Sequence, residues 1–379
     1  MPSLVSIFFA FFRLGLTAFG GPAMVAYIKE FAVEKRKWLD RGTFHEGVAL
    51  AQAVPGAIAM QVAAYVGLKI RGISGGIVSF VGFGLPAFIL MIVLSVLYER
   101  THSIPEVVSI FTGLKIIVVA IVANSTLSFA KPIVKSKGEI SVAFLSFILF
   151  TLKFNPFLII ILCFLSSQLI FRDEISTEKI TSKKINFSGL IILVVIIFAF
   201  LSLLFFFDKT LFILAITMMK IDLFAFGGAY ASLPLMLHEF VERLHWLDEK
   251  TFMDAIALGQ VTPGPIVITA TFVGYLLKGF IGAVVATIAV FFPSFIIIAF
   301  ASEIGDKIKN SKVFIRAKRG LIASFSGLLL FVSLKFISAV SWDWIKLLMV
   351  ILSFLCLIKR ISLFYIVMAG SVLSILFFH

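Results

Sequence analysis

Charged residues are scarce in this sequence. They make up 14% of its 379 residues, whereas a soluble domain carries about a quarter. Hydrophobic residues make up 61% of the chain, and 44 residues are phenylalanine. Apolar runs such as 187–207 exceed the ~18 uncharged residues that mark a membrane-spanning helix. The scarcity of charge excludes an ordinary soluble domain and predicts an all-α, polytopic membrane protein.

Cysteine is also rare, and the motifs of several enzyme classes are missing. Cys163 and Cys356 each lie inside an apolar run, where core packing is a sufficient role, so we expect neither a disulfide nor a cysteine metal site. The sequence has no His-x-x-Glu metal spacing, no Ser/His/Asp set at membrane depth and no phosphate-binding P-loop. We therefore expect no enzyme, no cofactor and no ATP-driven pump formed by this chain alone.

The formal net charge is +13, and the basic residues lie in short loops between apolar segments. That distribution is typical of cytoplasmic loops, so we do not expect the chain to bind nucleic acid. The first apolar segment begins near Met1, has no basic leader and contains Arg13, which favours a retained first helix over a cleaved signal. We expect a multi-pass protein of the cytoplasmic membrane, surrounded by lipid.

The sequence repeats itself internally. Phe19-Gly20-Gly21 recurs 207 positions later as Phe226-Gly227-Gly228 (226 − 19). The same offset, within one residue, relates a longer series of matches: Trp38 and Trp246, Phe44 and Phe252, Gln52 and Gln260, Pro55-Gly56 and Pro263-Gly264, Arg71-Gly72 and Lys278-Gly279, Pro86 and Pro293, and Gly113 and Gly320. A series in register indicates two homologous halves, at roughly 1–135 and 210–340.

We divide the chain into a first repeat (1–171), a linker with a connecting helix (172–209) and a second repeat (210–379). The first repeat is expected to begin with a broken helix at 3–29, followed by two short helical pieces that meet at Pro55-Gly56. Two long spans are expected next, at 74–98 and 106–130, and then two short ones, at 138–152 and 155–171. The stretch 172–186 is polar and is expected to be a solvated tether. The whole chain would have about 10–12 membrane helices, some of them broken and some forming short hairpins.

Loop charges indicate how the repeats are oriented. The segment 29–41 is basic, whereas its counterpart 237–250 is mostly acidic, and the bias reverses in the loop after Pro293. By the positive-inside rule, equivalent loops then lie on opposite sides of the membrane, which makes the repeats inverted, as in many secondary transporters. A simple count of helices gives an even number of crossings between the repeats and would make them parallel. We favour the charge pattern, because helix boundaries are the weaker prediction.

The glycines interrupt helices that should span the membrane. Non-helical backbone at membrane depth persists only where protein buries it or where it lines a wet cavity. A helix that restarts after Gly20-Gly21, with Pro22 in its first turn, presents unpaired N–H groups to an anion. Gly227-Gly228 would supply a second such site, and the breaks at Pro55-Gly56 and Pro263-Gly264 add two more. The alternative is a packing notch for a neighbouring helix.

Two cations lie deep in these broken helices. Arg13 is about ten residues into its helix, near the middle of a ~30 Å core at ~1.5 Å per residue, and Lys220 occupies the equivalent position. Buried cations usually face a pathway or a partner, and two of them suit a dianion. Snorkelling of the side chains to the interface is the alternative. Asp222, which has no acidic counterpart, could neutralise Lys220.

Neutral polar residues near the breaks complete the candidate site. Their amides and hydroxyls could bind an oxyanion that must also leave, or could satisfy the broken backbone; they are Gln52, Gln260, Thr262, Thr269 and Thr271. Lys115 and Asn124 also lie within a span, but neither matches a polar residue in the other repeat, so their roles stay open.

Several motifs resemble the chromate ion transporter family in its two-domain form: "GLTAFGGPAMVAYI", "WLDRGTFHEGVALAQAVPG", "FAFGGAYASLPLM" and "FMDAIALGQVTPGPIVITATFVGYLLKG". The resemblance covers most of both repeats and is weakest over 131–209 and the last forty or so residues. It implies export of chromate across the cytoplasmic membrane, with sulfate as the related oxyanion, and repeats of opposite topology.

The family's motifs fall on three short stretches of this chain. Its Phe-Gly-Gly-Pro lies at Phe19 to Pro22, its second-repeat motif at Phe226 to Gly228, and its Pro-Gly-Pro at Pro263, Gly264 and Pro265. The first repeat departs from the pattern, because Ala57 stands where the family usually has the second proline.

The expected function is a secondary transporter that exports chromate or a related tetrahedral oxyanion. Uptake or exchange of sulfate or another small anion is the alternative within transport. An intramembrane enzyme would need a catalytic set at depth, where Asp222 is the only acid, and a structural subunit would not need duplicated breaks. The expected partners are the anion and membrane lipid, and a homodimer is left open.

Overall fold

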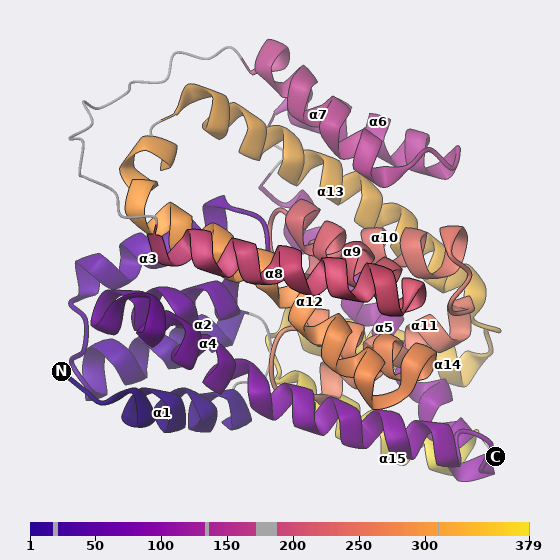
Figure 1. Ribbon diagram of the computed structural model, residues 1–379. Helices are drawn as coiled ribbons and strands as arrows, with labels where there is room; N and C mark the ends of the chain where they lie inside the picture. Colours follow the sequence, from indigo (N-terminus) through magenta and orange to yellow (C-terminus); the bar gives the residue numbers. More distant parts are fainter. Residues whose placement is uncertain (18–21, 133–135, 172–187, 310, 379) are drawn as a thin grey trace. The chain divides into compact units, whose positions relative to one another are not determined.

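The computed structural model describes residues 1–17, 22–132, 136–171, 188–309 and 311–378 (Figure 1). All the regular secondary structure of these residues is helical, which confirms the all-α class. Among them, four helices are long and apolar enough to cross a membrane, and five shorter apolar helices accompany them. The chain is an all-α membrane protein with several crossings.

The first repeat follows the expected order of broken helix, short pieces and spans. Its helices are α1 (Leu4–Thr17), α2 (Pro22–Lys29), a π-helix η1 (Glu30–Lys35), α3 (Arg41–Ala53), α4 (Ile58–Thr101), α5 (Pro105–Ala130), α6 (Lys137–Thr151) and α7 (Pro156–Ile170). The predicted tether 172–186 lies outside the described residues.

The second repeat has the same order, preceded by a connecting helix. The connecting helix is α8 (Ser188–Phe207). The helices that follow are α9 (Lys209–Phe224), η2 (Ala229–Ala231), α10 (Ser232–Met236), a π-helix η3 (Leu237–Arg243), α11 (Glu249–Val261), η4 (Ile266–Ile268), α12 (Thr269–Lys309), α13 (Lys312–Ala339), α14 (Trp344–Ile358) and α15 (Leu363–Phe377). Two stretches expected as loops are partly helical. The π-helices η1 and η3 lie in the segments after each broken helix, and Lys312 to Arg319 form the start of α13.

The two longest helices, α4 and α12, are each two arms joined by a turn. Arg71 and Gly72 leave helical geometry (φ −141° and +62°), and Lys278 and Gly279 do the same (φ −144° and +57°). In α4 the two arms fold back on each other. This is shown by the Ser79 hydroxyl of the second arm, which donates to the Ala63 carbonyl of the first at 2.8 Å. Glycine is required at both turns, since a side chain is strained at this φ. The matching dihedral angles show that the sequence repeat is also a structural repeat.

The first arm of α4, 58–70, also packs against α3 as a short hairpin. A Cβ on Gly47 in α3 would lie 2.2 Å from the Tyr65 ring, so the two helices are in contact there. Gly47 lies nine residues before Gly56, and Tyr65 lies nine residues after it. Each arm has 13 residues and is about 20 Å long, which is less than the ~30 Å core. The hairpin turns at 54–57, and Gly56 has φ +115° there. Gly264 has φ +118° at the equivalent position, so the predicted break at Pro55-Gly56 is confirmed and recurs.

The repeated Trp-Leu-Asp motif has a local structural role. Asp40 caps the N-terminus of α3 by accepting from the Thr43 N–H at 2.9 Å, and Asp248 caps α11 by accepting from the Thr251 N–H at 2.7 Å. Each tryptophan packs on a phenylalanine in the preceding π-helix segment, Trp38 on Phe31 and Trp246 on Phe240. The motif therefore begins the first helix of each short hairpin segment, because an aspartate cap satisfies N–H groups that the helix leaves unpaired.

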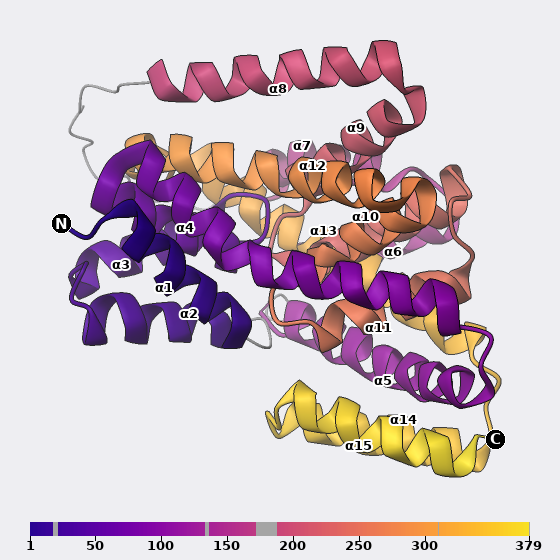
Figure 2. The ribbon, with the colours of Figure 1, turned by 60° about the horizontal axis from the view of Figure 1, so that its bottom comes forward.

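The chain forms two compact units, and neither is one sequence half. Unit 1 comprises 1–92, 174–229 and 263–315, and unit 2 comprises 93–173, 230–262 and 316–379. In unit 1, α9 packs along α12, and Phe80 of α4 contacts Phe291 and Phe295 of α12. In unit 2, α14 and α15 lie against α5, as Figure 2 shows. Each unit is thus built from both repeats.

Candidate substrate-binding site

The predicted break at Gly20-Gly21 lies outside the described residues, which stop at residue 17 and resume at residue 22. α1 ends at Thr17 and α2 begins at Pro22. Phe19, Gly20 and Gly21 lie outside the described residues, as does the Pro22 side chain. The position of Pro22 agrees with its usual place in the first turn of a helix, because its missing N–H would be unpaired there in any case.

The second broken helix is described in full. α9 ends at Phe224, Gly227 and Gly228 have φ +99° and +103°, and helical structure resumes at Ala229. A Cβ on Gly228 would lie 3.1 Å from the flexible end of Ile58. The backbone conformation, more than the space, requires glycine here. Phe226 precedes the glycines and is half-buried.

The two deep cations differ in their surroundings. Arg13 is exposed on α1, whereas Lys220 is half-buried on α9. Asp222 is fully buried, and its carboxylate accepts from the Ser294 N–H at 2.8 Å and from the Ser294 hydroxyl at 2.9 Å. Both of these hydrogen bonds of Asp222 are therefore made to Ser294 of α12.

The tip of the first hairpin lies against the second broken helix. The Gly56 N–H donates to the Ala225 carbonyl at 3.0 Å, and the Gln61 amide donates to the Pro55 carbonyl at 2.6 Å. These residues all belong to unit 1. A break of the first repeat and a non-equivalent break of the second, 169 positions apart in sequence (225 − 56), therefore meet in space. Gln52 is exposed on α3, four residues before the tip.

The turn of the second repeat that is equivalent to the first hairpin tip, at 262–265, is the second tip. The threonines near it bond to backbone carbonyls. The Thr262 hydroxyl donates to the Gly259 carbonyl at 3.0 Å, and the Thr269 hydroxyl donates to the Ile266 carbonyl at 2.7 Å. A hydroxyl has one proton, so neither is free to donate to an anion in this conformation. Thr271 shares a hydrogen bond with Thr287 at 2.7 Å. In unit 2, Gln260 is half-buried and contacts the Tyr230 hydroxyl at 3.4 Å.

The Pro-Gly-Pro of the second tip has no N–H on Pro263 or Pro265. Gly264 is buried, and a Cβ there would lie 2.9 Å from the Cβ of Ala87. The acceptor equivalent to Ala225 is residue 18, which is not among the described residues. The second tip is therefore held against α4 by close packing of small groups.

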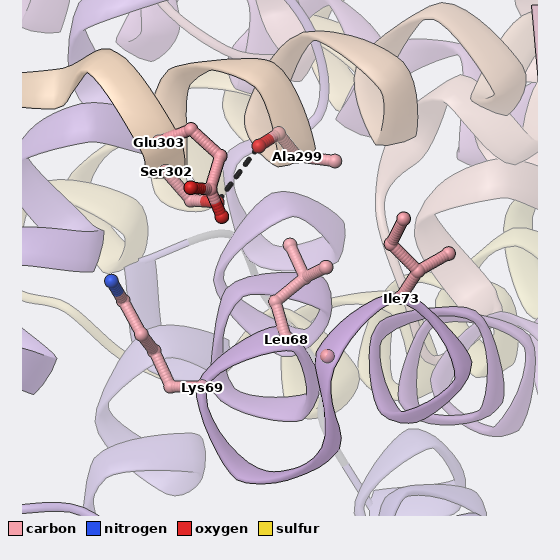
Figure 3. Close-up of a pocket in the computed structure, with 7 residues that line it drawn as sticks. Leu68, Lys69, Ile73, Ala299, Ser302 and Glu303 are labelled. Carbon is pink, nitrogen blue, oxygen red and sulfur yellow. Dashed lines mark hydrogen bonds between the residues drawn. The ribbon is translucent and has the colours of Figure 1, made fainter. Parts of the chain in front are cut away.

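Unit 1 has a small hollow between α4 and α12 (Figure 3). It has about 440 Å³ of empty space, part of it open to solvent, and its lining includes Lys69, Ser302 and Glu303. The Ser302 hydroxyl donates to the Ala299 carbonyl, and the Lys69 ammonium lies 5.1 Å from the centre of the Tyr65 ring. The hollow is beside the turn at Gly72, and its lining contains none of the predicted site residues.

Unit 2 contains an ion pair formed by Lys115, whose role the sequence leaves open. Lys115 of α5 lies 3.5 Å from Asp254 of α11, and the Tyr98 hydroxyl donates to the same carboxylate at 3.1 Å. The side chains of Lys115 and Asp254 are 21% and 8% exposed. The available signal was a lysine in the middle of an apolar span, which usually has a partner. Asn124, the other open residue, is half-buried on the same helix.

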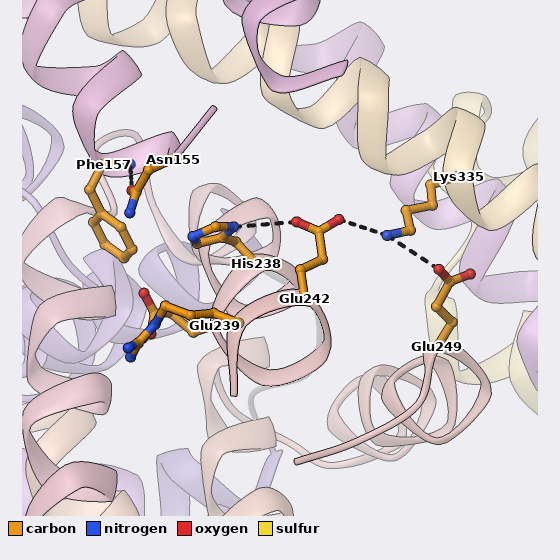
Figure 4. Close-up of polar contacts among 8 residues, drawn as sticks. Asn155, Phe157, His238, Glu239, Glu242, Glu249 and Lys335 are labelled. Carbon is orange, nitrogen blue, oxygen red and sulfur yellow. Dashed lines mark hydrogen bonds and ion pairs between the residues drawn. The ribbon is translucent and has the colours of Figure 1, made fainter. Parts of the chain in front are cut away.

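A second charged network joins η3, α11 and α13 in unit 2 (Figure 4). Lys335 lies 2.7 Å from Glu242 and 3.2 Å from Glu249, and His238 contacts the other oxygen of Glu242 at 3.3 Å. Arg243 pairs with Glu239, whose side chain is fully buried. These acids explain part of the charge bias seen in the 237–250 segment, because they neutralise basic side chains within the unit.

Comparison with known proteins places the chain in a family. The chromate transporter model matches residues 5–167 and 212–375, one match for each repeat. An uncharacterized transporter of Methanocaldococcus jannaschii is 44% identical over 99% of this chain and 94% of its own length. The chromate transport protein of Cupriavidus metallidurans is 31% identical over 76% of this chain and 71% of its own length. No solved structure matches. With both repeats matched, the chain belongs to the chromate transporter family, a family of multi-pass membrane transporters and not of enzymes.

Proposed function

We propose that the chain is a secondary transporter that exports chromate, or a related tetrahedral oxyanion such as sulfate, across the cytoplasmic membrane. The observation that carries this proposal is the contact in unit 1 between the hairpin tip of the first repeat and the broken helix of the second, in a member of the chromate transporter family. Irregular backbone from inverted repeats is the usual way in which secondary transporters form a substrate site near the midplane. The inverted orientation is itself part of the proposal.

The anion is expected at the broken helices and not at the first hairpin tip. The Gly56 N–H is already bonded within the protein, whereas Gly227 and Gly228 provide backbone without side chains seven and eight residues after Lys220. Gly20-Gly21 and Arg13 are the corresponding elements of the first repeat. Gln52 and Gln260 remain candidate donors, whereas Thr262, Thr269 and the tip residues Pro55, Gly56, Pro263, Gly264 and Pro265 would shape the site.

Export has a physical rationale. With a negative interior, each exported negative charge gains about 2.3 kcal/mol per 100 mV, and a dianion gains about twice that. The membrane potential is therefore sufficient to drive export without a coupled ion.

Purified protein in liposomes tests the proposal. We expect flux of labelled chromate that rises with an imposed potential and that falls when unlabelled sulfate is added on the same side. Lys220→Gln is expected to reduce the flux at least tenfold in a protein that still folds, and Lys209→Gln, at the start of the same helix, is the matched control. Absence of anion flux through correctly folded wild-type protein would exclude the proposed function. Flux that requires an anion on the opposite side would replace export with exchange.

A further inference from the structure

The first hairpin tip is held by a short chain of hydrogen bonds. The Ala57 N–H donates to the Ser294 hydroxyl oxygen at 3.0 Å, and that hydroxyl donates to Asp222 at 2.9 Å. The Ser294 N–H donates to the other carboxylate oxygen at 2.8 Å. Asp222, Ser294 and Ala57 are fully buried. The carboxylate of the second repeat is thus connected to the backbone of the first through one serine.

A proline inside α12 lies next to this arrangement. Pro293 lies directly before Ser294, and a proline inside a helix both lacks an N–H and clashes with the carbonyl four residues earlier. The Ser294 N–H, directly after this proline, donates to Asp222. Gln61 also restrains the tip, since its amide donates to the Pro55 carbonyl.

The second tip occupies the equivalent place without these bonds. Ala87 stands where α12 has Ser294, Gly15 stands where α9 has Asp222, and Pro265 stands where the first tip has Ala57. The places correspond, because a Cβ on Gly56 would lie 2.0 Å from the Ser294 hydroxyl and a Cβ on Gly264 would lie 2.9 Å from Ala87. All three members of the hydrogen-bond chain are therefore present at one tip and missing at the other.

We propose that Asp222 and Ser294 are positioning residues that latch the first hairpin tip through the Ala57 N–H, so that the second tip carries the movement during transport. This inference rests on the proposed transport function for its consequence, but the latch itself can be tested without transport. It also explains why Ala57 stands where the family usually has proline, since proline has no N–H to donate to Ser294.

Among the described residues, Asp222 is the one ionisable group in the hydrogen bonds of the latch. Asp222 bonds directly to Ser294. Ser294 in turn contacts the Ala57 N–H and the Gln61 amide, and all of these groups are neutral. Charged side chains elsewhere on the packed elements have other neighbours: Lys278 pairs with Asp208, and Lys69 lies over Tyr65. The latch therefore depends on the Ser294 donors, and loss of the hydroxyl affects both Asp222 and Ala57.

Hydrogen exchange of the peptide that covers 54–61 measures the latch directly in purified protein. We expect Ser294→Ala to speed exchange of the tip amides at least tenfold, whereas Ser294→Thr, which keeps the hydroxyl, leaves exchange within twofold of wild type. Ala87→Ser is the matched control at the second tip, where Pro265 has no N–H, and should leave exchange at 54–61 unchanged. Unchanged exchange in Ser294→Ala would overturn the latch.

Transport in liposomes tests the consequence. Ala57→Pro gives the first tip the Pro-Gly-Pro of the second and removes a single donor, so it keeps the test available if Ser294→Ala does not fold. We expect its Vmax for chromate to fall at least fivefold with KM within twofold of wild type, and the double variant with Ser294→Ala to be no worse than either single variant. Additive losses, or a raised KM with unchanged Vmax, would overturn the positioning role. If wild-type protein transports no anion, the proposed function fails, and the exchange experiment still decides the latch.

Discussion

The two hairpin tips have nearly the same backbone but different bonds. Gly56 and Gly264 share a φ close to +116°, and each faces the long arm that the other repeat contributes to unit 1. The first tip is tied to Ser294 and Asp222, whereas the second packs on Ala87. A duplicated fold can thus keep its geometry while one copy loses its polar contacts. The difference predicts where substitutions should affect the repeats equally and where they should not.

The largest difference is expected from alanine at the two tip glycines. Gly56→Ala combines an unfavourable φ with a Cβ 2.0 Å from the Ser294 hydroxyl, so it should lower the free energy of unfolding by about 3 kcal/mol or more. Gly264→Ala has the same backbone strain but a milder contact, 2.9 Å from the Cβ of Ala87, and should lower it by about 2 kcal/mol. Thermal unfolding of both variants in detergent measures the difference. A Gly264→Ala protein that is less stable than Gly56→Ala would contradict the account of the two tips.

A second difference lies in unit 2, where Lys115 pairs with Asp254, whereas the position equivalent to Lys115 in the second repeat is Ile322. Asp254→Asn should cost about 2 kcal/mol, which is below the roughly 3–5 kcal/mol of a fully buried pair, because Lys115 keeps part of its exposure. The double variant Lys115→Gln/Asp254→Asn should recover part of the loss. Equal stability of Asp254→Asn and wild type would mean that the pair contributes nothing.

The arm turns of α4 and α12 should respond equally. Gly72 and Gly279 have φ +62° and +57°, and a Cβ on either would have no atom within 4 Å. Gly72→Ala and Gly279→Ala should therefore each cost about 2 kcal/mol through backbone strain alone. A difference of more than about 1 kcal/mol between them in the same unfolding assay would show that the turns are not equivalent.

The smallest effect is expected at the helix caps. Asp248→Ala removes the N-cap of α11 and should cost about 1 kcal/mol, and Asp40→Ala should act in the same direction on α3. The Thr251 N–H holds the pKa of Asp248 below its usual value. The stabilisation by this cap is therefore complete above the unfolded pKa of about 3.9 and is lost as the pH falls through the lower folded pKa. Acid unfolding of Asp248→Ala should accordingly show a weaker pH dependence than wild type.

Much of the candidate site could be predicted from the residues that break helices. Gly227, Gly228, Gly56 and Gly264 all have positive φ, as glycines in an apolar span suggest. The roles of the polar residues were harder to predict, because a threonine beside a break has a carbonyl within its own turn. Thr262 and Thr269 bond to such carbonyls. An anion-binding role for the site residues remains a proposal.

The sequence by itself determined the class, the repeat and the positions of the breaks. Long apolar runs must form helices in lipid, and paired glycines and prolines must interrupt them, so these features follow from local chemistry. Only the tertiary structure decided which groups meet. Asp222 bonds to Ser294, 72 positions away, and the tip of one repeat lies on the broken helix of the other within an interleaved unit. A buried polar group takes whichever partner the packing brings within about 3 Å, and no local pattern encodes that distance.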